Sequence, residues 1–381
     1  MYVDPYTIAV PDSVLADLHA RLEAARLPDA VLDAGWEYGS SLDYMRELVA
    51  YWKGAYDWRA RERYLNSFPH ELATIDGYDI HFVHARGKGP SPLPLIMTHG
   101  WPSSFTEMLA IIPLLTDPAS AGGDPRDAFD VIVPSVPGYG FSSRPTARGF
   151  VPAHTLWAKL MTEHLGYTRF VAEGGDIGAG ITTRIARLHP DVVHGICLLA
   201  VTDPYLGPGS APLTSAERAY QDGVAEWDRT EGGYQLEQAT KPQTLAYGLN
   251  DSPVGLAAWI VEKFRSWSDC GGDVERRFTR DELLDNVMIY WTTQTIASSV
   301  RYYYEGARHA PPMREGERVE KPTAALLFPA DLVSPPPREW IERSYNLQQY
   351  TLMPKGGHFA AHEEPALLAE AIRGFCRRFR S

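Results

Sequence analysis

An aspartate stands at the centre of a tight glycine turn in the middle of the chain. Asp176 lies in the run Gly174-Gly175-Asp176-Ile177-Gly178, after a β-rich stretch at 170–172 and before a helical stretch at 181–188. A side chain on such a sharp strand-to-helix turn is presented at the edge of a sheet, where it can act as a nucleophile. A hydroxyl in this place would attack carbonyl carbons, whereas a carboxylate attacks an alkyl carbon and forms an ester. Asp176 therefore predicts two-step chemistry, in which the ester is afterwards hydrolysed at its own carbonyl.

A histidine and a second aspartate late in the chain could perform that hydrolysis. Asp331 stands in Pro329-Ala330-Asp331, after a predicted strand, and His358 stands in Gly356-Gly357-His358, after the last predicted strand. A histidine whose tautomer is fixed by a carboxylate can take a proton from water. The order nucleophile, acid, histidine along the chain is that of α/β-hydrolases. We therefore expect His358, oriented by Asp331, to activate the water that attacks the Asp176 ester.

The run His99-Gly100-Trp101-Pro102 predicts the donors for the negative charge that forms during this attack. It follows a predicted strand that ends at Thr98, and Pro102 restricts the backbone of the turn. A turn at this place lets the backbone N–H of Trp101 face the nucleophile. Together with the N–H of Ile177 it is expected to form an oxyanion hole.

The elements that must position these residues alternate between strand and helix. Strands are predicted at 78–83, 93–98, 128–133, 170–172, 192–201, 323–328 and 349–353. Strands that alternate with helical stretches indicate an α/β fold with a mostly parallel, doubly wound sheet. Functional groups gather at the carboxyl ends of the strands in such sheets. The sequence thus predicts that the three turns meet at one edge of the sheet.

Two helical regions interrupt or precede this alternation and divide the chain into four parts. Residues 1–75 are expected to form an N-terminal helical extension, with helices that begin near Asp12 and Leu42. Residues 76–203 and 311–381 form the two halves of the core, the second of which ends in a helix at 365–379. Residues 204–310 form a helical cap, with helices predicted at 214–227, 253–267 and 280–299.

Composition and charge exclude several other classes of protein. The chain has 381 residues, of which 44% are hydrophobic and 22% charged, as is typical of soluble globular proteins. A net charge of −12 argues against nucleic acid or an anionic membrane as partner, and the 3 cysteines are too few and too scattered for a disulfide framework or a zinc site. The N-terminus lacks a targeting pattern and no apolar run reaches the length of a membrane span. We therefore expect a cytoplasmic protein without a membrane anchor, with a homodimer as one candidate assembly.

These motifs strongly resemble those of the epoxide hydrolases, which have the α/β-hydrolase fold. The resemblance rests on His99-Gly100-Trp101-Pro102, on Pro137-Gly138-Tyr139-Gly140-Phe141-Ser142 and on Gly174-Gly175-Asp176. Residues 1–75 look like the N-terminal segment of the microsomal-type branch, which wraps the core and packs on the cap. Residues 249–259 are similar to the cap signature of that branch. The resemblance covers nearly the whole chain.

The resemblance also implies two cap tyrosines that hold the epoxide oxygen and donate a proton to the opening ring. Tyr234, in Gly232-Gly233-Tyr234, matches one of them. Tyr303 matches the other, but Tyr304 stands where the family usually has a basic residue, so that Tyr302 and Tyr304 stay open as alternative donors. A phenol suits the task because it is neutral at pH 7 and still donates to a developing alkoxide.

The function implied is that of an epoxide hydrolase that converts small hydrophobic epoxides and water to vicinal diols, with detoxification as its role. No metal and no organic cofactor are expected. Trp101, Phe141 and Phe359 flank the catalytic turns and are expected to line an apolar substrate pocket.

Two alternative functions stay open. A haloalkane dehalogenase shares the ester chemistry, but it commonly has a tryptophan where this chain has Ile177. A catalytically idle binding protein could keep the same fold.

Overall fold

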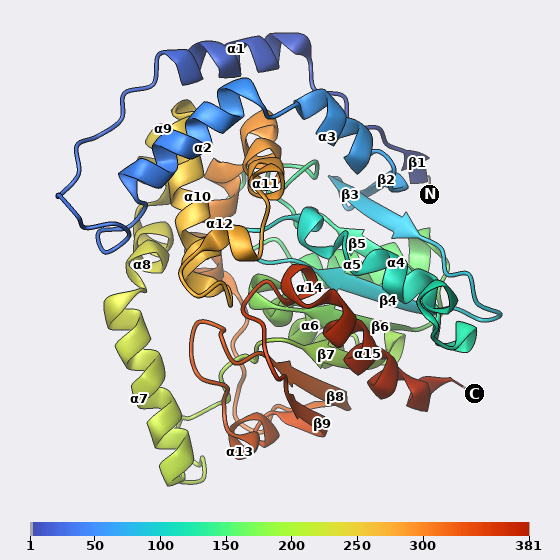
Figure 1. Cartoon of the computed structure of the whole chain (residues 1–381). Helices are drawn as coiled ribbons and strands as arrows, with labels where there is room; N and C mark the ends of the chain where they lie inside the picture. Colours follow the sequence, from blue (N-terminus) through green and yellow to red (C-terminus); the bar gives the residue numbers. More distant parts are fainter. Residues whose placement is uncertain (1–2, 381) are drawn as a thin grey trace.

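The computed structural model describes residues 3–380, and its centre is a 9-stranded sheet in the order β1-β2-β3-β5-β4-β6-β7-β8-β9 (Figure 1). Neighbouring strands are parallel from β5 through β4 to β9, whereas β1, β2 and β3 are joined to the sheet by antiparallel pairing. The mostly parallel sheet that the alternation predicts is thus confirmed. The strands are β1 (Val3–Pro5), β2 (His70–Ile75), β3 (Tyr78–Ala85), β4 (Leu93–Thr98), β5 (Phe129–Pro134), β6 (Phe170–Gly174), β7 (Val193–Leu198), β8 (Val319–Leu327) and β9 (Tyr345–Leu352).

The central strands are apolar along their length because helices cover both of their faces. Every residue of β5 and β6 is buried, and four of the six residues of β4 form a continuous buried run. Helix α6 packs on β6, and α5 packs on α6, while α4 packs on β5 and contacts α15. The core helices are α4 (Ile112–Thr116), α5 (Ala153–Lys159), α6 (Asp176–Leu188), α13 (Arg338–Glu342), α14 (Ala360–Glu363) and α15 (Pro365–Cys376).

The N-terminal segment differs from the expected all-helical extension in one respect. Its helices are α1 (Asp12–Glu23), α2 (Leu42–Gly54) and α3 (Trp58–Leu65), but the segment also supplies β1 and β2. Strand β2 pairs with β3 in a hairpin whose turn is Asp76-Gly77, with φ of 50° and 84° at these two residues. The short, polar β2 sequence carries little apolar alternation, which is why the sequence did not predict this strand.

The cap is a set of helices inserted between β7 and β8, and it lies beside α2 in Figure 1. Its helices are α7 (Ser215–Thr230), α8 (Gly233–Thr240), α9 (Pro242–Asp251), α10 (Pro253–Trp267), α11 (Arg280–Thr293) and α12 (Ile296–His309). The single helix predicted at 280–299 is in fact two helices. Gln294 adopts a left-handed conformation with φ of 53° and ends α11, so α12 can turn back toward the core. Across residues 3–380, no helix has both the length and the apolar character of a membrane span.

The N-terminal helices are fastened to the cap by buried polar contacts. The Arg61 guanidinium forms a bidentate ion pair with Asp285 on α11, from Nη2 to Oδ2 at 2.5 Å and from Nε to Oδ1 at 3.0 Å, and the Tyr56 hydroxyl donates to the same carboxylate at 2.9 Å. One turn earlier on α11, Asp281 accepts a hydrogen bond of 2.8 Å from Tyr51. A charged carboxylate this deeply buried requires such partners. These contacts hold the cap over the core on the side of the N-terminal segment.

Candidate active site

Asp176 lies on a strained turn that only glycines on either side allow. It is the first residue of α6 and has a φ of 47°, a left-handed conformation that residues with a side chain rarely adopt. A Cβ atom on Gly178 would lie 1.9 Å from the carbonyl oxygen of Thr98, and one on Gly174 would lie 2.4 Å from Gly178. The glycines therefore let the turn approach the end of β4, and the carboxylate is presented at the carboxyl edge of the sheet.

The two oxygens of Asp176 have different surroundings. Oδ1 accepts a hydrogen bond of 2.9 Å from the backbone N–H of Trp101. The backbone N–H of Ile177 acts on the same carboxylate by lowering its pKa. Oδ2 lies 3.7 Å from Nε2 of His358. Burial raises the pKa of Asp176 above its ordinary value, whereas His358 and the two N–H donors oppose this rise. Of the two N–H groups predicted for an oxyanion hole, that of Trp101 thus already donates to the nucleophile.

His358 joins Asp176 to Asp331. Nδ1 of His358 lies 2.7 Å from Oδ1 of Asp331, which places the N–H on Nδ1 and directs Nε2 toward Asp176. The backbone N–H of His358 donates to the carbonyl of Trp267, the last residue of α10, at 2.9 Å. Burial lowers the pKa of His358, but the carboxylates of Asp331 and Asp176 outweigh it and raise this pKa to about 9. The structure therefore brings together the three residues that the chain order predicts.

An aromatic enclosure covers the nucleophile from the cap side. The ring of Tyr234, on α8, stacks on Trp101 at a centroid distance of 5.2 Å, and Tyr303, on α12, meets both rings edge-on at 5.9 and 6.2 Å. Trp267 contacts Tyr234 at 5.1 Å and His358 at 5.2 Å. Burial, and in second place the neighbouring phenol and carboxylate, raise the pKa of Tyr303, and the pKa of Tyr234 is raised by burial and by Asp176. Both phenols therefore stay neutral at pH 7.

The neighbouring tyrosines of α12 point elsewhere. Tyr302 packs its ring on Tyr139 and Phe150, and its buried hydroxyl has no hydrogen-bond partner within residues 3–380. Tyr304 lies beneath the guanidinium of Arg308, 3.6 Å from its ring centroid. Of the three consecutive tyrosines, it is Tyr303 that faces Trp101 and Tyr234.

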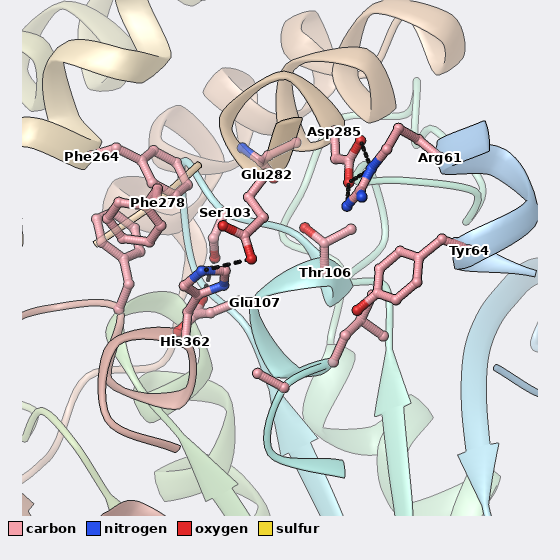
Figure 2. Close-up of a pocket in the computed structure, with 14 residues that line it drawn as sticks. Arg61, Tyr64, Ser103, Thr106, Glu107, Phe264, Phe278, Glu282, Asp285 and His362 are labelled. Atoms are coloured by element: carbon pink, nitrogen blue, oxygen red, sulfur yellow. Dashed lines mark hydrogen bonds and ion pairs between the residues drawn. The ribbon is translucent and has the colours of Figure 1, made fainter. Parts of the chain in front are cut away.

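Two of the aromatic residues expected in the substrate pocket have other surroundings. Phe141 packs on Tyr6 and His81, with ring centroids 5.4 and 5.2 Å apart, in a cluster between the N-terminal segment and β3. Phe359 stacks on Phe264 at 4.2 Å, and both rings line a small cavity, in which Figure 2 labels Phe264. Only Trp101 of the three expected residues joins the aromatic enclosure.

Sequence reasoning missed Lys263 and Trp267. The buried ammonium of Lys263 lies 4.9 Å from the ring centroid of Tyr234, and also faces the rings of Trp259 and Trp267. Residues 259, 263 and 267 recur at a spacing of four and therefore share one face of α10. That spacing was a signal in the sequence, although only the packing of α8 against α10 shows that this face meets Tyr234.

The chain matches two known protein families, which together span residues 3–365. A family described as "Epoxide hydrolase N terminus" matches residues 3–108, and one described as "alpha/beta hydrolase fold" matches residues 94–365. The chain is 45% identical to a putative epoxide hydrolase of Stigmatella aurantiaca, over 100% of this chain and 86% of that protein. It is 39% identical to epoxide hydrolase 1 of Sus scrofa, over 98% of this chain and 88% of that protein.

A solved structure extends the likeness to three dimensions. The juvenile hormone epoxide hydrolase of the silkworm Bombyx mori superposes with a TM-score of 0.83 at 30% identity, over 100% of this chain and 94% of that one. The α/β-hydrolase fold expected from the sequence is thereby confirmed. The resemblance to epoxide hydrolases, which the three short sequence motifs indicated, is confirmed as well. On these grounds, the chain belongs to the epoxide hydrolase family.

Proposed function

We propose that this protein opens epoxides to vicinal diols, with Asp176 as nucleophile and His358, held by Asp331, as base. The observation that carries the proposal is the pair of buried phenols, Tyr234 and Tyr303, whose rings pack on each other and on Trp101, the residue whose N–H donates to Asp176. An alkyl carbon is a poor target for a carboxylate unless the leaving oxygen is protonated as the ring opens, and a neutral phenol supplies that proton.

The partners of Asp176 assign a role to each of its oxygens in the first step. Oδ1 is held by the Trp101 N–H, so Oδ2 is free to attack an epoxide carbon. The carbon–oxygen bond of the ring breaks, and the epoxide oxygen takes a proton from Tyr234 or Tyr303. The product is an ester through Oδ2 whose carbonyl oxygen is Oδ1, already placed against its donors.

In the second step His358 removes a proton from water, and the resulting hydroxide attacks the Asp176 carbonyl carbon. The negative charge develops on Oδ1, where the N–H groups of Trp101 and Ile177 donate to it. The bond to Oδ2 then breaks and the diol leaves with that oxygen. Of the two protons of the water, one ends on the second hydroxyl of the diol and one restores the phenol.

Formation of the ester also lowers the pKa of the base, His358. The negative charge of Asp176 raises the pKa of His358 in the free enzyme, and esterification removes that charge. The pKa of His358 therefore falls once the ester has formed, so that a larger fraction of the imidazole is neutral and able to accept a proton.

The same features argue against the two alternatives. A dehalogenase has no leaving oxygen to protonate, and Ile177 offers no side-chain N–H to a halide; release of chloride or bromide from haloalkanes would support that reading. A binding protein without catalysis has no use for Asp176, Asp331 and His358 in contact.

A cytoplasmic location and a homodimer stay predictions, which cell fractionation and light scattering would test.

A single turnover in water enriched in ¹⁸O tests the proposal. With enzyme in excess over a small aromatic epoxide, the first diol should carry unlabelled oxygen from Asp176, and the label should appear in the enzyme. Asp176→Ala should form no diol. Direct incorporation of ¹⁸O into the first diol would contradict an ester intermediate.

A further inference from the structure

A small cavity lies where the turn after Trp101-Pro102 meets α3 and α11 (Figure 2). Its walls come from α3, from the turn Phe105–Met108, from α11 and from α14, and its volume is about 50 Å³. A cavity needs only about 10–15 Å³ on this measure to hold one water molecule. It shares no lining residue with the aromatic enclosure formed by Trp101, Tyr234, Trp267 and Tyr303.

The cavity has the polar lining that bound water requires. Glu107 and Ser103 face it from the core, and Asn286 faces it from the cap. The side-chain amide of Asn286 donates to the carbonyl of Pro102 at 2.8 Å, but its buried Oδ1 has no partner within residues 3–380. A buried acceptor without a partner is costly and is ordinarily satisfied by an ordered water. The walls therefore offer an acceptor to a water molecule, besides the carboxyl group of Glu107.

The cavity reaches the catalytic residues through one serine. The Ser103 hydroxyl is hydrogen-bonded to the Glu107 carboxyl and lies 3.1 Å from the carbonyl oxygen of Gly100. Gly100 itself touches the nucleophile, because a Cβ atom built on it would lie 2.4 Å from Cβ of Asp176. Phe359, which also lines the cavity, directly follows His358 in the chain. Glu107 is thus two short contacts from Gly100, which itself touches Asp176.

Glu107 can change its charge in this place. Burial raises its pKa to about 7, against the opposing influence of Ser103 and His358. A serine has one hydrogen to donate, so both contacts of Ser103 are hydrogen bonds only when Glu107 is protonated; once ionised, Glu107 takes that hydrogen and can also accept from a water. The other charged or titratable groups that line the cavity are Arg61, Tyr64, Glu282, Asp285 and His362, and those that interact with Glu107 from outside it are Glu173, Asp176, Tyr290 and His358.

During the second step the aromatic side of the site is filled by the esterified substrate, so the water has to reach the ester from another direction. We propose that the cavity supplies this water and that Glu107 is the positioning residue, whose carboxylate accepts one hydrogen bond from the water and turns its other O–H toward His358. This inference rests on the proposed two-step reaction. It predicts that Glu107 serves ester hydrolysis and not ring opening.

Rapid-mixing kinetics on the full chain separate the two steps. The tryptophan fluorescence of Trp101 and Trp267 reports ester formation and decay, and acid quench with intact-mass measurement counts the ester directly. Glu107→Gln should leave the rate constant of ester formation within about twofold of wild type. It should lower that of ester hydrolysis at least about tenfold, so that the ester accumulates.

Glu173→Gln is a matched control. Glu173 is also a buried glutamate near Glu107, but it does not line the cavity and both of its carboxyl oxygens lack partners within residues 3–380. Its exchange should change neither rate constant by more than about twofold. Equal losses of ester hydrolysis in both variants would show a general electrostatic effect and overturn the inference.

Ser103→Ala provides an independent test should Glu107→Gln fold poorly. Without the hydroxyl, Glu107 loses its hydrogen-bond partner, and ester hydrolysis should again slow selectively. Hydrolysis at the wild-type rate in either folded variant, or an equal loss in both steps, would overturn the role of Glu107. An absence of ester in the wild-type enzyme itself would instead contradict the proposed function.

Discussion

The backbone N–H of Trp101 donates to Oδ1 of Asp176 at 2.9 Å, which leaves Oδ2 as the unrestrained oxygen of the nucleophile. One contact therefore divides the carboxylate into an attacking atom and a future carbonyl oxygen. The N–H can hold this place because the preceding residue has no side chain: Cβ, Oδ1 and Cγ of Asp176 all lie within 2.7 Å of where a Cβ on Gly100 would be.

Gly100→Ala should therefore abolish most of the activity without unfolding the core. The added methyl group forces the carboxylate and the Trp101 N–H apart, which disturbs both the attack and the oxyanion hole. Loss of one oxyanion donor alone costs about 10²–10³ in rate. We expect kcat/KM to fall by at least this factor at an unchanged circular dichroism spectrum. Activity within tenfold of wild type would contradict the tight contact.

His358→Gln should trap the ester. Ring opening uses Asp176 and the phenols, whereas only hydrolysis needs the base, so the first step should proceed and the second should slow by a factor of about 10²–10⁴. Intact-mass spectrometry should find the protein heavier by the mass of one epoxide. His309→Gln, at an exposed position on α12, serves as the control and should show no more adduct than wild type.

Tyr234→Phe and Tyr303→Phe should slow ring opening, each by about 10²-fold or more, because each removes a hydroxyl from the aromatic enclosure that packs on Trp101. Tyr302→Phe is the matched control. It removes a buried hydroxyl that has no partner within residues 3–380, so the exchange should be neutral or slightly stabilising. The measurement is the rate constant of ester formation in each of the three variants. If Tyr302→Phe lowered this rate constant as much as Tyr303→Phe does, the assignment of Tyr303 as a proton donor would be contradicted.

The sequence predicted those parts of the site that are local in the chain. The turn at Asp176, the Trp101 turn and the strand-end positions of Asp331 and His358 are each encoded by a few consecutive residues, and parallel strands necessarily bring their carboxyl ends together. Contacts between distant segments could not be predicted in this way. That Tyr303 and not Tyr302 packs on Trp101 and Tyr234 depends on the rotation of α12 about its axis. The end of α11 was also hidden, because the left-handed residue there is Gln294 and not a glycine.

The charge of Asp176 should be visible in the titration of His358. The carboxylates of Asp331 and Asp176 raise the pKa of His358 to about 9 although burial lowers it. In Asp176→Asn, NMR titration of the imidazole should give a lower pKa than in wild type. In Asp331→Asn the fall should be larger, because Asp331 is the nearer and stronger influence. An unchanged pKa in Asp176→Asn would contradict the proposed tuning of the base by esterification.

The same pKa links folding stability to pH. Because the pKa of His358 is raised above the value of about 6.5 in the unfolded chain, its contribution is fully present below pH 6.5 and is lost as pH rises through about 9. The difference corresponds to about 3 kcal/mol. Urea unfolding at pH 6 and at pH 9.5 should show a smaller pH dependence in His358→Gln than in wild type.

The attachment of the N-terminal segment to the cap should depend on Arg61. Its ion pair with Asp285 joins α3 to α11, and the Asp285 side chain is only 4% exposed. Arg61→Met leaves this carboxylate with Tyr56 as its remaining donor and should destabilise the protein by about 3 kcal/mol, measured by urea unfolding. Adding Asp285→Asn removes the uncompensated charge while the amide oxygen still accepts from Tyr56. The double variant should therefore be more stable than Arg61→Met alone, and a further loss on adding Asp285→Asn would show that the carboxylate has other partners.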